Sequence, residues 1–169
     1  MNMKRLSYPL LAAILLLTTA AGPSSRTTLA PLLGARDWLN GRETAQSVAG
    51  RVVLVDVFTY DCINCRNIMP TLQSLYRDEG RNGLVVVGVH SPETPAEKQR
   101  SNVVENLQTQ GIVWPVAIDN DYTLWNAYGV DAWPTQLFFD RHGRLREAIA
   151  GDSHEAQVRA IVRQLLSEH

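Results

Sequence analysis

The chain has 169 residues, of which 45% are hydrophobic and 20% charged, and its formal net charge is −1. These totals indicate a globular protein with one sizeable apolar core, and the length is too short for two full-sized domains. The small excess of negative charge argues against nucleic acid or an anionic membrane as the main partner, because both bind basic surfaces.

The first 21 residues differ in kind from the rest. Lys4 and Arg5 precede the apolar run Leu10–Leu17, and small residues follow up to Ala21. This pattern predicts a secretory signal peptide at residues 1–21, and therefore a periplasmic or otherwise exported protein. The alternative is an uncleaved membrane anchor, for which the run is shorter than the ~20 residues that span a bilayer.

Residues 22–37 are small or polar with some Leu and Pro, which predicts a linker, and residues 38–169 are predicted to form one domain. The runs Val52–Phe58 and Leu84–His90 are continuous and rich in β-branched residues, as in buried central strands. The remaining predicted elements are, in chain order, a helix from Cys62 to about Tyr76, a polar helix ending near Gln110, a short strand at residues 113–119, a helix at Asp121–Tyr128, strands at Thr135–Asp140 and Arg144–Ala150, and a last helix capped by Asp152 and Glu155. This order predicts an α/β fold with a central mixed sheet, helices on both faces and an antiparallel hairpin at one edge.

Cys62 and Cys65 are the only cysteines of the chain. A disulfide across so short a loop stabilises a fold by roughly 2 kcal/mol, against nearly 5 kcal/mol for a loop of about a hundred residues. The pair is therefore a poor structural staple and a better redox couple or half of a metal site. At the start of a helix, Cys62 would meet unpaired N–H groups and the positive end of the helix dipole, which favour the attacking thiolate. Cys65, one turn further in, could resolve a mixed disulfide.

The metal interpretation has less support. A structural zinc site usually needs four protein ligands, and the four histidines of the chain show no ligand spacing with the cysteines. We therefore predict no metal and no cofactor other than a redox-active disulfide between Cys62 and Cys65.

Asp56 lies near the middle of the run Val52–Phe58. Side chains alternate faces along a strand, so Asp56 shares a face with Leu54 and Phe58. Burial raises the pKa of a carboxyl group, and such an acid could accept the proton of Cys65 as that thiol attacks. The alternative is that Asp56 reaches solvent at a strand end.

The segments VDVFTYDCINC and VDAWPT, with Pro70 in the predicted helix, resemble the thioredoxin-like family over residues 39–166. In that family an aspartate lies six residues before the first cysteine, as Asp56 does, and a proline lies eight residues after it, as Pro70 does. The resemblance implies the thioredoxin-like fold and thiol–disulfide exchange by Cys62 and Cys65.

The same resemblance implies where a substrate binds. A cis-proline that precedes a strand faces the active site in this family, and Pro134 matches it. The backbone around that proline binds the substrate chain, so Pro134 and Trp133 are candidate substrate-binding residues. Tyr60, in the loop before Cys62, is a third candidate.

The segment Ser91–Asn120 between two predicted strands resembles an insertion of the exported redoxin branch, which includes TlpA/ResA-type proteins. The phrases TYDCINCR, GVHSPE and PVAIDNDYTLWNAYG are most similar to the thioredoxin-like domain of DipZ-type proteins. Those proteins often carry a membrane electron-transfer domain in the same chain. The resemblance therefore implies protein thiol and disulfide substrates, a role as reductant and a separate membrane electron donor of the DsbD/CcdA type, and we expect a monomer.

The sequence departs from the family at two positions. Phe58 stands where the family usually has tryptophan, and Asp61 directly precedes Cys62. A negative neighbour opposes thiolate formation, and Arg66, just after Cys65, could offset it.

The main prediction is an exported thiol–disulfide oxidoreductase. One alternative is a thiol peroxidase of the redoxin superfamily, although the closely spaced cysteines fit dithiol exchange better. The other is a copper-delivery module, in which two thiolates would hold a soft cation.

Overall fold

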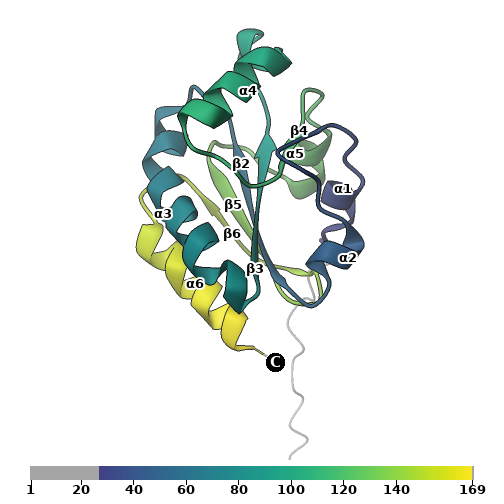
Figure 1. The fold of residues 1–169 in the computed structure, drawn as a ribbon, viewed down its shortest axis with the longest axis vertical. Coiled ribbons are helices and arrows are strands. Elements are labelled where there is room, and N and C mark those ends of the chain that lie inside the picture. Colours follow the sequence, from purple (N-terminus) through teal and green to yellow (C-terminus); the bar gives the residue numbers. More distant parts are fainter. Residues whose placement is uncertain (1–26, 169) are drawn as a thin grey trace, which may run out of the picture.

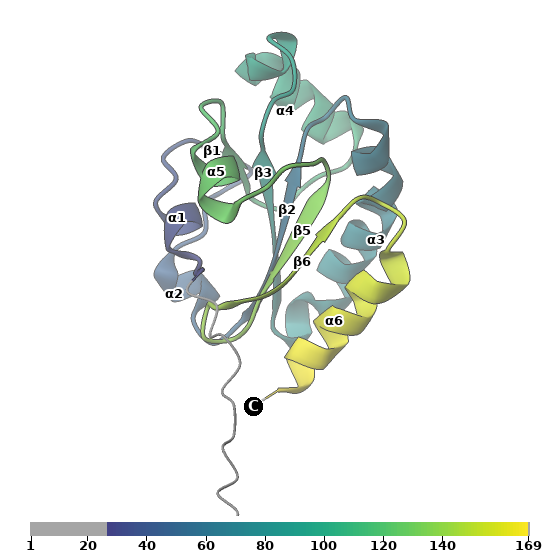
Figure 2. The same ribbon diagram turned by 180° about the vertical axis from the view of Figure 1, so that it is seen from behind.

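The computed structural model describes residues 27–168, so the predicted signal peptide and the start of the predicted linker lie outside the described residues. Six strands form one sheet in the order β1-β4-β3-β2-β5-β6 (Figures 1 and 2). The strands are β1 (Trp38–Leu39), β2 (Val52–Phe58), β3 (Leu84–His90), β4 (Val116–Ile118), β5 (Thr135–Phe139) and β6 (Leu145–Ala150). β2, β3 and β4 pair in parallel, whereas the other pairs are antiparallel, which confirms the predicted mixed sheet.

Helices cover both faces of the sheet. α3 (Ile63–Glu79) and α6 (Glu155–Ser167) lie side by side on one face, and α1 (Ala30–Leu33), α2 (Ala45–Val48) and α5 (Thr123–Tyr128) cover the other (Figures 1 and 2). α4 (Arg100–Thr109) extends the first layer, and the short 3₁₀ helices η1 (Gly80–Asn82) and η2 (Ala96–Lys98) flank β3. Within residues 27–168, none of the helices combines the length and apolarity that a bilayer crossing requires.

β2 lies at the centre of the sheet and is buried along its whole length. Its side chains alternate between two apolar cores: Leu54 and Phe58 pack under α3 and α6, and Val55 and Val57 pack under the helices of the other face. Asp56 therefore projects to the same face as Leu54 and Phe58, as the alternation predicted, and the core on this face also contains Cys65.

The N-terminal part of the described chain is packed against the domain. The segment predicted as a linker contains α1, in which Leu32 is fully buried. The Leu32 backbone N–H donates a hydrogen bond to the Tyr128 hydroxyl at 3.0 Å. Residues 27–37 thus contribute to the second apolar core.

The predicted cap of the last helix is wrong. His154 is the N-cap residue of α6 and makes no capping bond through its side chain. Asp152 instead accepts a hydrogen bond from Asn67 Nδ2 at 2.6 Å, which links the segment before α6 to the first turns of α3.

Candidate active site

The two cysteines lie at the start of α3, directly after the carboxyl end of β2. Cys62 is the N-cap residue and has extended backbone angles. Its Sγ atom faces the backbone carbonyl oxygen of Trp133 at 4.0 Å. Cys65 lies inside the first turn and is only 1% exposed, whereas Cys62 is partly exposed. A partner can therefore reach Cys62 more easily than Cys65.

Asp56 is a buried acid on the face of the sheet that packs against Cys65. It is 1% exposed, and its Oδ1 atom accepts a hydrogen bond from Gln136 Nε2 at 2.9 Å. Burial raises the pKa of Asp56 to about 7, although the hydrogen bond from Gln136 acts in the opposite direction. Asp56 can therefore gain or lose a proton near neutral pH.

The Cys65 thiol is linked electrostatically to this acid. Burial raises the pKa of Cys65 most strongly, and the negative charge of Asp56 raises it further. A hydrogen bond from the Thr59 backbone acts in the opposite direction. Cys65 thus stays protonated at neutral pH and needs a proton acceptor in order to attack.

Replacing Asp56 with asparagine should stabilise the fold at pH 8. The pKa of Asp56 is about 7 in the fold and 3.8 is its ordinary value, so the unfolded chain loses this proton first as pH rises. The carboxyl group therefore lowers stability progressively between about pH 4 and pH 7 and fully above pH 7. We expect Asp56→Asn to raise the free energy of unfolding at pH 8 by about 2 to 4 kcal/mol, with a much smaller change at pH 4. Urea unfolding at both pH values measures the difference, and equal changes at the two values would contradict it.

The segment around Pro134 completes one side of the cysteine site. The peptide bond between Trp133 and Pro134 is cis, in agreement with the family resemblance. The Trp133 indole N–H donates a hydrogen bond to the Ser91 carbonyl oxygen at 3.0 Å. The centroids of the Trp133 and Trp125 rings are 4.4 Å apart. These contacts fix Trp133 so that its carbonyl oxygen faces Cys62.

Tyr60 and His90 form a second side of the site. Tyr60 stacks on His90 with ring centroids 5.6 Å apart, and the rings of His90 and Phe58 form a T-shaped pair. Burial lowers the pKa of His90 to about 4, so this side chain is neutral at neutral pH. His90 therefore supports the loop before Cys62 as a neutral aromatic ring.

The charged neighbours of Cys62 pair with each other at the surface. Arg66 Nη1 lies 3.4 Å from Asp61 Oδ1, and both side chains are largely exposed. Solvent screens such a pair strongly, so its contribution to stability is small. The structure thus places Arg66 beside Asp61, the position expected for it from the sequence.

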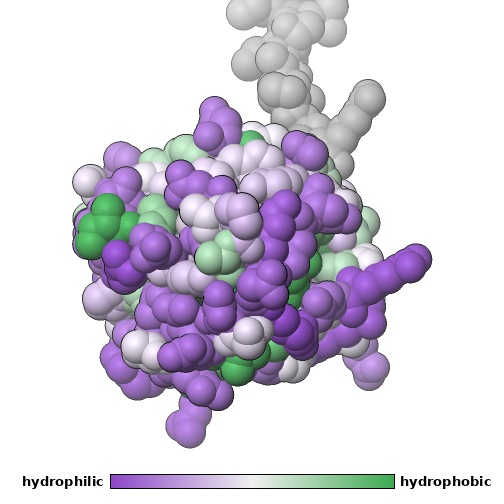
Figure 3. All heavy atoms as spheres, turned by 90° about the horizontal axis from the view of Figure 1, so that it is seen from above, coloured by the Kyte–Doolittle hydropathy of each residue, from purple (hydrophilic) through white to green (hydrophobic). Residues whose placement is uncertain are grey.

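The surface around the cysteines is mostly polar. Figure 3 views the end of the molecule at which α3 begins and shows hydrophobic residues only in separate spots. Ile63, between the two cysteines, is 61% exposed, and among residues 27–168 it is one of three exposed large apolar side chains. A partner that reaches Cys62 would contact Ile63 as well.

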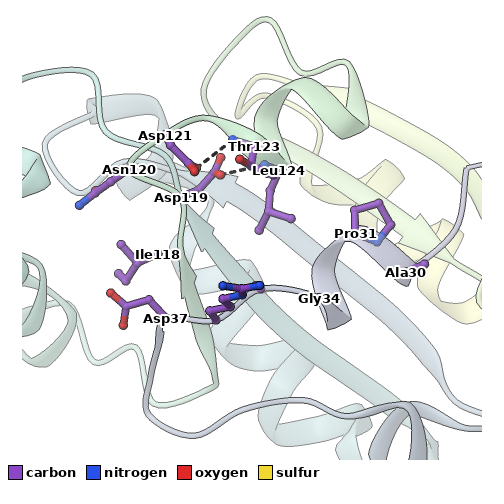
Figure 4. Close-up of a pocket in the computed structure, with 12 residues that line it drawn as sticks. Ala30, Pro31, Gly34, Asp37, Ile118, Asp119, Asn120, Asp121, Thr123 and Leu124 are labelled. Carbon is purple, nitrogen blue, oxygen red and sulfur yellow. Dashed lines mark hydrogen bonds between the residues drawn. The ribbon is translucent and has the colours of Figure 1, made fainter.

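A pocket of about 660 Å³ lies between α1 and the connection from β4 to α5, apart from the cysteine site (Figure 4). The wall residue Asp119 is buried and accepts hydrogen bonds from the backbones of Leu124 and Trp125 and from the Ser91 hydroxyl. Its carboxylate is thus occupied in holding the start of α5. None of the predicted site residues lines this pocket, and we assign it no part in the reaction.

The structure brings the predicted site residues to one end of the sheet but adds partners that the sequence did not indicate. Gln136 is the hydrogen-bond partner of Asp56, and Glu97 binds the loop before Cys62. Among residues 27–168, acidic, cysteine and histidine side chains form no group of three or more that could share a metal ion.

Comparison with known proteins places this geometry in a family. The profile of a family described as thioredoxin-like matches residues 50–145, more than half of the chain. The DipZ protein of Mycobacterium tuberculosis is 36% identical over 153 residues, which cover 88% of this chain and 22% of DipZ. The chain thus spans about a fifth of the length of that relative.

Two shorter proteins match over nearly their whole length. The thiol-disulfide oxidoreductase YkuV of Bacillus subtilis is 28% identical over 85% of this chain and 97% of its own. The crystal structure of a thiol-disulfide isomerase from Corynebacterium glutamicum superposes with a TM-score of 0.74 and 26% identity, covering 81% of this chain and 95% of the isomerase. Together with the fold and the cysteine site, these matches show that the chain belongs to the thioredoxin-like family.

Proposed function

We propose that this protein is a thiol–disulfide oxidoreductase that exchanges electrons with protein disulfides through Cys62 and Cys65. One observation supports this proposal above all: a partly exposed cysteine at a helix N-terminus lies one turn from a buried cysteine whose thiol is coupled electrostatically to a buried acid. The names of YkuV and of the Corynebacterium isomerase agree with this class of activity.

The proposed reaction has two displacement steps. The Cys62 thiolate attacks one sulfur of a substrate disulfide, and the other substrate sulfur leaves as a thiolate that takes a proton from water. Cys65 then gives its proton to Asp56 and attacks Cys62 Sγ, which releases the second substrate sulfur as a thiolate. This thiolate also takes a proton from water, and Asp56 returns its proton to the solvent. The substrate gains two electrons and becomes a dithiol, while the protein is left with a Cys62–Cys65 disulfide and needs no other cofactor.

We also propose that Trp133, Pro134 and Tyr60 contact the substrate segment next to its disulfide. The Trp133 carbonyl oxygen already faces Cys62 Sγ, and Tyr60 lies in the loop that leads to it. An extended peptide placed there would find backbone hydrogen-bonding groups beside the attacking sulfur.

The cellular role is proposed from the sequence pattern and from the likeness to a relative. Export of the chain would follow from the pattern at residues 1–21, and the likeness to DipZ supports a reductant that receives electrons from a membrane donor of the DsbD/CcdA type. A redox titration of Cys62 and Cys65 against glutathione tests this direction, because a reductant should have a potential well below that of the glutathione couple.

Replacing Cys65 with alanine should trap substrates on the protein. Cys62 can still attack, but the second displacement is lost, so the mixed disulfide persists. We expect a covalent adduct with a reporter protein disulfide such as that of insulin, detected by mass spectrometry without reductant. The matched control is the Cys62→Ala/Cys65→Ala double variant, which should form no adduct. Equal adduct formation by both variants would contradict attack by Cys62.

A further inference from the structure

Glu97 of η2 is a buried acid whose carboxylate joins two loops. It is 1% exposed, and its Oε2 atom accepts hydrogen bonds from the backbone N–H groups of Glu93 at 2.8 Å and Thr94 at 2.6 Å. Its Oε1 atom accepts from the Thr59 hydroxyl at 2.5 Å and from the Asp61 backbone N–H at 3.3 Å. One oxygen thus binds the loop after β3, and the other binds the loop before Cys62.

Further contacts from the same part of the chain hold this loop. Gln110 Nε2 donates to the Tyr60 carbonyl oxygen at 3.0 Å, and the Tyr60 ring stacks on His90. Each of the three residues between β2 and Cys62 is therefore bound by a residue from the region 90–110. Glu97 is the charged member of these contacts, and hydrogen bonds to a charged group are the strong ones.

The loop that Glu97 holds touches both cysteines. Thr59 is fully buried, and its backbone lies close enough to the Cys65 sulfur to lower the pKa of that thiol. Asp61 is the residue directly before Cys62. Burial raises the pKa of Glu97, but the hydrogen bonds from Thr59 and the three backbone N–H groups together bring it below its usual value, so Glu97 is ionised.

We propose that Glu97 is a positioning residue of the cysteine site, which acts through Thr59 to aim a backbone N–H at Cys65 as that sulfur gains negative charge. This inference rests on the proposed function and adds a role for the segment between β3 and α4. That segment becomes part of the reaction machinery, because it fixes the hydrogen bond that Cys65 needs when it attacks.

The test measures the two displacement steps separately, with the full chain and a small aromatic disulfide whose released thiolate is coloured. The reduced protein should release one coloured thiolate when Cys62 attacks and a second when Cys65 resolves the mixed disulfide. For Glu97→Gln and Thr59→Val, we expect the second release at pH 7 to slow about threefold to tenfold, which corresponds to the net contribution of one intramolecular hydrogen bond. Thr59→Ser keeps the hydroxyl group and should recover most of the rate that Thr59→Val loses.

The sign of the effect separates positioning from simple charge. Removing a nearby negative charge would by itself favour the Cys65 thiolate, so a charge effect alone would speed the second release in Glu97→Gln and leave Thr59→Val unchanged. Either of those results would overturn the proposal, as would unchanged second-release rates in both variants. Glu105→Gln, which changes an exposed side chain of α4 outside this segment, is the matched control and should retain both rates. The aromatic disulfide reports the two displacement steps without any protein substrate. If the wild-type protein failed to reduce insulin, the proposed function would be contradicted, but the effect of Glu97 on the Cys65 step could still be measured.

Discussion

Replacing Cys62 with serine should lower the rate of protein-disulfide reduction by about 1000-fold or more. Cys62 is the partly exposed cysteine at the N-cap of α3, and a serine hydroxyl at neutral pH supplies almost no anionic nucleophile for attack on sulfur. Removal of a covalent nucleophile generally leaves only a small residue of activity. Insulin reduction, followed with dithiothreitol as the electron source and corrected for the reaction without protein, measures the loss.

The matched control is Asn64→Ser, which also places a serine between β2 and Cys65 but leaves both thiols in place. Asn64 is exposed, so this change should keep the fold and most of the activity, although residues between the cysteines adjust the potential. Retention of wild-type activity by Cys62→Ser would rule out this sulfur as the attacking atom. It would also direct attention to Cys65, despite the burial of that side chain.

The central strands could be predicted because local pattern and tertiary environment agree. β2 and β3 are continuous apolar runs, and the structure buries every residue of both. β1 has only two residues, and it is a strand only because it pairs with β4. The paired residues Leu39 and Val116 are 77 positions apart in the sequence. No local pattern carries that information.

The chemistry of the site was predictable to a similar extent. Alternation along β2 predicted that Asp56 shares a face with Leu54 and Phe58, and the close spacing of the two cysteines indicated a redox couple. The partner of Asp56 depends on the register in which β2 meets β5, where Asp56 lies opposite Gln136. Glu97 has no local signal at all, since a glutamate in a polar loop is usually solvated, and only the fold brings it to Thr59.

The burial of Cys65 also bears on the copper-delivery alternative. A soft cation would require both sulfurs as thiolates, and burial together with the Asp56 charge raises the pKa of the Cys65 thiol. Proton transfer from Cys65 to Asp56 during a displacement step needs no lasting thiolate. The site is therefore better suited to disulfide exchange than to permanent metal binding.

Replacing Asp56 with asparagine should slow the Cys65 step about 100-fold at pH 7, the usual effect of removing a general base. Burial raises the pKa of Asp56 to about 7, so in the wild-type protein the fraction of Asp56 able to accept a proton rises through neutral pH. The rate of the second thiolate release described above should therefore increase with pH around 7 in the wild type. Asp56→Asn should lose this inflection and rise only at higher pH, where hydroxide can remove the proton.

The matched variant is Gln136→Leu, which keeps the acid but removes the hydrogen bond to its Oδ1 atom. That bond stabilises the carboxylate, so its loss should raise the pKa of Asp56 and move the inflection to higher pH without abolishing it. Stopped-flow measurements of both variants between pH 5 and pH 9 distinguish a proton acceptor from a merely buried acid. If Asp56 is a buried acid without a role in proton transfer, Asp56→Asn should leave the rate at pH 7 unchanged. If Asp56 is the proton acceptor, Asp56→Asn should abolish the inflection and Gln136→Leu should move it to higher pH.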